Sequence, residues 1–186
     1  MDPIVEQHRR ASDGLLKAAH AADGRWDRPS PCTEWDARGV VEHVIGFHEV
    51  LVLKPLGIRV DRPRDDPAAR WQVTADALVS ALDGEGALEA TVEMPGGRST
   101  ALRHLVPTLT TDVLVHTWDL ARAVGASDRL DAELCEIAYT RATENRDALR
   151  GSSMFGDEVP VPDDAPVQHR MLGLFGRDPD WRPTTA

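Results

Sequence analysis

Cysteine and lysine are scarce in this chain of 186 residues. The two cysteines, Cys32 and Cys135, lie far apart and form no CxxC motif, which argues against a structural disulfide and a zinc knuckle. Of the 21 lysine and arginine residues only Lys17 and Lys54 are lysines, and the net charge is −10. Nucleic acids and anionic membranes are bound by clustered positive charge, which so acidic a chain lacks. We therefore expect neither nucleic acid nor membrane among its partners.

Long hydrophobic runs and the common catalytic motifs are also missing. The unbroken apolar runs are far shorter than the ~20 residues that cross a membrane. The opening MDPIVEQHRR has neither the apolar stretch nor the cleavage site of a secretory signal, so we expect a cytoplasmic protein. The sequence contains no GxGxxG, GxxxxGK[ST], GxSxG or HExxH motif. These absences leave the usual dinucleotide, phosphate-loop, hydrolase and zinc-protease interpretations without support.

The chain is rich in helical periodicity. Apolar residues recur at intervals of three and four, and they predict helices at residues 3–22, 34–53, 67–82, 100–124, 129–149 and, more briefly, 165–175. Thr33, followed three residues later by Asp36, predicts a capping box at the start of the second helix. Asp66 before Pro67 predicts the N-cap and first turn of the third.

These elements predict an all-α fold, an antiparallel four-helix bundle in a single domain. Residues 88–93 and 98–102 flank an MPGG turn and predict a small β-hairpin insertion. We expect the bundle to occupy residues 1–150. Residues 151–186 are rich in Gly, Pro and Asp, and we expect them to form a C-terminal tail draped over the bundle, with a short helix that packs on it.

Two histidines and an aspartate interrupt the apolar stripes. His43 lies on the inward face that Val40 and Phe47 define, and His116 lies inside the apolar stripe of its own helix with Asp112 one turn before it. Together they offer three nitrogen and oxygen ligands with one position left open, in the bundle interior where helical proteins build metal sites. Each residue alone is more often a core or capping residue. The pattern therefore leaves open a metal-free helical dimer with histidines in its core.

Three stretches carry a resemblance to a known family. SPCTEWDARGVVEHVIG resembles the Pro-Cys-x-x-Trp lead-in and His-bearing second helix of the DinB-like metal-binding bundles. DVLVHTWDLARAVG resembles their acid/His helix, in the form found in the branch related to mycothiol-dependent maleylpyruvate isomerase. FGDEVPVPDDAPVQHRMLGLFGRDPDW is similar to the C-terminal segment of small actinobacterial members of that branch.

The resemblance implies a DinB-like four-helix bundle that holds a divalent metal, commonly zinc or nickel, on His43, Asp112 and His116. Asp112 stands where the characterised isomerase has Glu, and that enzyme's separate C-terminal domain has no counterpart, so maleylpyruvate isomerisation itself is not carried over. The resemblance favours a thiol-dependent transferase or isomerase, with mycothiol as cosubstrate and a small electrophile as substrate. The alternative is a non-catalytic metal- or small-ligand-binding bundle, and a homodimer is left open in both cases.

The neighbours of these ligands receive separate predictions. Asp119, one turn beyond His116, is expected to be solvated or paired with Arg122, and its alternative role is to accept a hydrogen bond from His116. Trp35 and Trp118 are expected to be packing residues. No catalytic residue is assigned.

Overall fold

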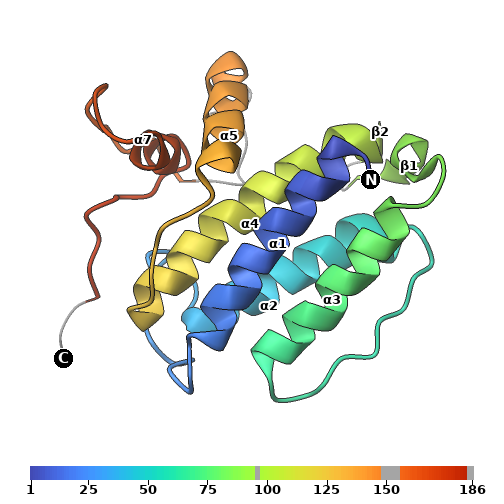
Figure 1. The fold of residues 1–186 in the computed structure, drawn as a ribbon, viewed down its shortest axis with the longest axis horizontal. Helices are drawn as coiled ribbons and strands as arrows, with labels where there is room; N and C mark the ends of the chain where they lie inside the picture. The colour runs from blue at the N-terminus through green and yellow to red at the C-terminus, as the bar shows by residue number, and fades with distance from the viewer. Residues whose placement is uncertain (95–96, 148–155, 184–186) are drawn as a thin grey trace.

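Four long helices form a bundle in the computed structural model, which describes residues 1–94, 97–147 and 156–183 (Figure 1). They are α1 (Pro3–His20), α2 (Ala37–His48), α3 (Pro67–Leu82) and α4 (Leu102–Val124). Both α1 and α2 pack against α3 and α4. In Figure 1, α1 and α4 run in one direction while α2 and α3 run in the other. The expected all-α bundle is confirmed, with antiparallel packing between these two pairs.

The start of α2 differs from the prediction. The helix begins at Ala37, and its N-cap is Asp36, whose side chain accepts a hydrogen bond from the Gly39 amide at 2.7 Å. The predicted cap at Thr33 is wrong because residues 28–36 form a folded loop, in which Pro29 pairs with Asp36 by a β-bridge. At its other end α2 continues as the π-helical turn η1 (Glu49–Leu53), so the predicted end at residue 53 is reached in a different helical form.

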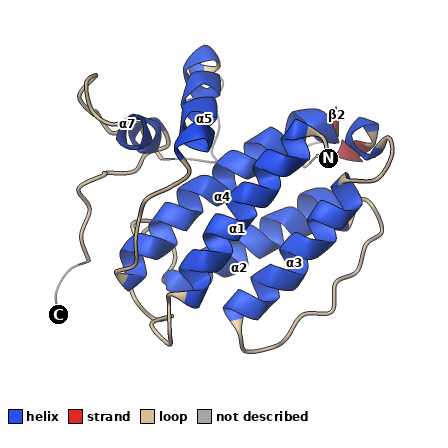
Figure 2. Ribbon diagram, in the orientation of Figure 1, coloured by secondary structure: helices blue, strands red, loops and turns tan. Residues whose placement is uncertain are grey.

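The β-hairpin is present between α3 and α4. Strand β1 (Thr91–Glu93) pairs antiparallel with β2 (Ser99–Ala101), and both follow the 3₁₀ turn η2 (Ala87–Glu89). Figure 2 shows the two strands of this hairpin in red at one end of the bundle helices. Helix α4 starts directly after β2, and Pro107 lies inside it.

Two further helices of the described residues lie beside the bundle. They are α5 (Ala132–Glu144) and α7 (Val167–Leu174), and they pack mainly on each other (Figure 1). The short helix of the tail was expected to pack on residues 1–150, and its main partner, α5, lies within that range. The predicted end of α5 at residue 149 and the start of the tail at 151 lie outside the described residues. No helix in the described ranges is long and apolar enough to cross a membrane.

Candidate metal centre

The three ligands expected from the sequence come together between α2 and α4. The Nε2 atom of His43 lies 3.9 Å from Oδ1 of Asp112, and that of His116 lies 3.5 Å from the same oxygen. One donor atom from each of the three residues lies within 4.8 Å of the others. Among the described His, Cys, Asp and Glu residues, this is the one such group of three.

The centre is buried on the α4 side and open beside α2. Asp112 and His116 are each 3% exposed, while the His43 side chain is 26% exposed. Oδ2 of Asp112 is buried and has no hydrogen-bond partner within the described residues. A carboxylate oxygen left in this state is costly, since burial removes its water without providing a replacement. The orphaned oxygen belongs to a carboxylate with two imidazoles beside its other oxygen, and this arrangement fits a bound cation.

The charges of the centre are strongly coupled. Burial alone would raise the pKa of Asp112, but the adjacent His116 and His43 outweigh it and hold that pKa below its ordinary value. Burial alone would lower the pKa of His116, but Asp112 and then Asp119 outweigh it and raise that pKa to about 9. In the absence of a bound cation, the charge on His116 thus compensates the buried carboxylate of Asp112.

Asp119 fixes the orientation of the His116 ring. Nδ1 of His116 donates to Oδ2 of Asp119 at 2.9 Å, which directs Nε2 toward Asp112. The expected pairing of Asp119 with Arg122 is wrong, because Asp119 is fully buried and lies next to His116, whereas Arg122 binds Asp128 at 2.9 Å. The structure instead has the alternative role, in which Asp119 accepts a hydrogen bond from His116.

Arg177, in the segment after α7, was not predicted from the sequence. Its Nη2 donates to Oδ2 of Asp119 at 2.8 Å, and its Nε donates to Oδ1 at 3.1 Å. Burial alone would raise the pKa of Asp119, but His116 and Arg177 hold it below its usual value. A fully buried aspartate such as Asp119 requires a positive charge beside it, which Arg177 supplies. The two residues are 58 positions apart in the sequence, so no local pattern indicated this partner.

Aromatic side chains hold His43 in place. The Trp35 ring stacks on the imidazole with 4.1 Å between centroids and 21° between planes, and Phe47 stacks at 5.6 Å. A Cβ atom at Gly39 would lie 2.8 Å from Cβ of Trp35, so glycine at this position permits the close approach. Trp35 therefore lines the centre in addition to packing, whereas Trp118 is a buried core residue as expected.

Two other residues near the centre take no part in it. His48 is fully buried one turn further along α2, where its Nδ1 donates to the Val44 carbonyl at 2.7 Å. Cys32 is a free, partly buried thiol whose pKa is raised by burial. Cys32 therefore stays protonated, which disfavours a role as a nucleophile.

Comparisons with known proteins give one family match and two similar relatives. The family model described as the mycothiol maleylpyruvate isomerase N-terminal domain matches residues 5–121, which include all three residues of the centre. Two uncharacterised proteins of Mycobacterium tuberculosis, from strains CDC 1551 / Oshkosh and ATCC 25618 / H37Rv, are each 33% identical over 188 aligned positions. The alignment covers 95% of this chain and 98% of each relative. No solved structure gives a significant match.

Proposed function

We propose that this chain, which belongs to the mycothiol maleylpyruvate isomerase N-terminal domain family, binds a divalent metal through His43, Asp112 and His116. One observation carries the proposal. The buried, unpartnered oxygen of Asp112 belongs to a carboxylate whose other oxygen has an imidazole nitrogen from each of two helices within 3.9 Å. Zinc and nickel suit this donor set, since both accept imidazole and carboxylate ligands.

The finer proposal is a thiol-dependent transferase or isomerase that acts on a small electrophile, with mycothiol as the thiol. A bound divalent cation lowers the pKa of a coordinated thiol and so supplies a nucleophile at neutral pH. The chain's own residues orient the metal ligands and exclude water from one side of the centre. Asp119 keeps Nε2 of His116 directed into the centre, and burial of Asp112 excludes water from that side. The side chain of His43 is partly exposed, so thiol and substrate would reach the metal from the side of His43.

The thiol step can be tested with protein in which cobalt replaces the natural metal. Three protein ligands leave an exchangeable position, and thiolate binding there adds an intense near-ultraviolet absorption. Titration with a small thiol should produce this band in the wild type and not in the His116→Ala variant. The exposed His104, also on α4, provides the control, and His104→Ala should behave as the wild type.

If no thiol produces the band while the cobalt still exchanges water, the thiol-dependent reaction is excluded. The non-catalytic metal- or ligand-binding bundle would then replace it. If the band appears equally in His116→Ala, the thiol binds at a different metal position.

A further inference from the structure

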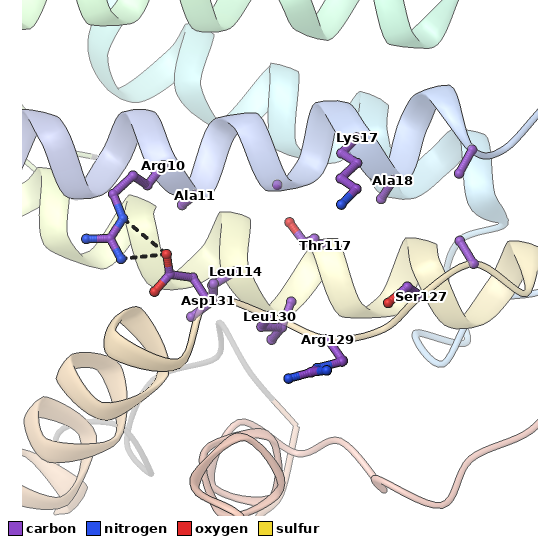
Figure 3. Close-up of a pocket in the computed structure, with 13 residues that line it drawn as sticks. Arg10, Ala11, Lys17, Ala18, Leu114, Thr117, Ser127, Arg129, Leu130 and Asp131 are labelled. Atoms are coloured by element: carbon purple, nitrogen blue, oxygen red, sulfur yellow. Dashed lines mark hydrogen bonds and ion pairs between the residues drawn. The ribbon is translucent and has the colours of Figure 1, made fainter.

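A hollow lies between α1, α4 and the segment that leads into α5 (Figure 3). Its volume is about 120 Å³. A protein cavity of about 150 Å³ accommodates benzene, which has six carbon atoms, so this somewhat smaller pocket has room for about four. Its floor is made of small and aliphatic side chains, which include Ala11, Ala18, Leu114 and Leu130.

The pocket is separate from the candidate metal centre. Leu114 and Thr117 line it from α4, and helical geometry places them roughly 200° and 140° around the axis from Asp112. The centre faces α2, whereas the pocket faces α1 and the segment of residues 126–131. A ligand in the pocket would therefore occupy the opposite side of α4.

The rim of the pocket is positively charged in a chain whose net charge is −10. Arg10 is already neutralised, because it binds Asp131 at 2.5 Å (Figure 3) and also Glu133 at 2.8 Å. Lys17 and Arg129 form no ion pair with any residue in the described ranges. They are two exposed cations at the mouth of one pocket.

The carboxylate in the lining does not cancel these two charges. One oxygen of Asp131 accepts from Arg10, and the other caps α5 by accepting from the amides of Glu133 and Leu134 at 3.1 and 3.2 Å. The Ser127 hydroxyl adds a hydrogen-bond donor on the same side of the pocket. The Arg129 guanidinium offers the planar pair of donors that suits a carboxylate.

Glycine in the middle of α1 keeps the pocket open. Gly14 lines it, and a Cβ at this position would make an ordinary contact of 3.8 Å with Cγ2 of Thr117. A larger side chain would extend into the hollow. Glycine inside a helix is less stable than alanine, so the space comes at the expense of helix stability.

We propose that this pocket binds a small organic anion, a carboxylate carried on an apolar body of about four carbon atoms. The carboxylate pairs with Lys17 and Arg129 at the mouth, and the apolar body lies on the aliphatic floor. The site is independent of the proposed metal and of the proposed reaction.

Calorimetric titration of the full chain with pentanoate tests the proposal, with 1-pentanol as the neutral comparison. Pentanoate should bind saturably and pentanol at least several-fold more weakly. Lys17→Gln should weaken pentanoate binding about three- to five-fold, the size expected for one exposed charge pair. Lys54→Gln alters the other lysine, which is 66% exposed and lies outside the pocket, so it should leave binding unchanged.

Two further experiments distinguish binding in this pocket from binding elsewhere on the chain. Gly14→Leu should abolish binding in a protein that still unfolds cooperatively, because its side chain fills the hollow. Removal of metal with a chelator should leave binding unchanged, whether or not the metal proposal holds. Absence of saturable binding, equal binding of pentanol, equal effects of the two lysine variants, or loss of binding on chelation would each overturn the proposal.

Discussion

His116 is held at both ring nitrogens by carboxylates from its own helix. Asp119 lies 2.9 Å from Nδ1, and Asp112 lies 3.5 Å from Nε2. Arg177 then holds Asp119 from the C-terminal segment. This chain of contacts gives the ring a single direction before any metal arrives, and it keeps the remaining proton on Nδ1 once Nε2 is free to bind a metal, which is the usual effect of a partner behind a metal ligand.

Removal of either supporting residue should therefore weaken metal binding while the ligands stay in place. Asp119→Ala should reduce metal affinity about 10- to 100-fold, and Arg177→Met should reduce it less, since the aspartate itself remains. Competition with a chromophoric chelator measures the affinity. Arg182→Met, an exposed arginine of the same segment, is the control. Unchanged affinity in Asp119→Ala would mean that His116 needs no such support.

A second histidine pair makes a separate prediction about stability. His8 and His48 are fully buried with 5.2 Å between ring centroids, and burial, followed by repulsion from His48, lowers the pKa of His8 to about 3. The unfolded chain binds a proton at this histidine near its ordinary pKa of about 6.5, while the folded chain does not until about pH 3. Acid thus favours the unfolded state between those values.

In metal-free protein, the free energy of unfolding should fall as the pH drops from about 6.5 toward 3, by up to about 1.4 kcal/mol per pH unit from His8 alone. Urea unfolding at about pH 7 and about pH 5 should show a smaller loss in His8→Gln than in the wild type. His20→Gln, an exposed histidine at the end of the same helix, should keep the wild-type loss. An identical loss in all three proteins would contradict the assignment.

At the level of single helices, periodicity predicted what lies within a helix better than where the helix begins. The third helix was expected at residues 67–82, as observed, because Asp66 accepts from the Ala69 amide and caps its start. The second was predicted to begin too early. Its start is set by Asp36, which accepts from the Gly39 amide, whereas the sequence pattern had placed the cap at Thr33.

The spacing along α4 also explains which part of the centre was predictable. Asp112, His116 and Asp119 are separated by four and three residues, so one helical face carries all three. His43 could be predicted because it shares the inward face of its own helix. Trp35 stacks on His43 from the preceding loop, and Arg177 arrives after α7, so tertiary structure alone places these two residues.

Across the full chain, the sequence predicted the helical bundle but not the direction in which each helix runs. The segment between α2 and α3 carries the chain back along the bundle, so these consecutive helices run the same way (Figure 1). The α5–α7 pair then lies beside the bundle, and the segment after it brings Arg177 to Asp119. The final segment therefore contributes to the environment of the candidate centre, although it lies outside the residues that the family model matches.

The proposed function requires that His43, Asp112 and His116 together hold one divalent metal. Elemental analysis of the purified chain, beside the His116→Ala and His104→Ala variants, is the decisive measurement. We expect about one equivalent of zinc or nickel in the wild type and in His104→Ala, and little in His116→Ala, which lacks a nitrogen ligand. Equal metal content in all three proteins, or no metal in the wild type even after incubation with zinc or nickel, would contradict the proposed site.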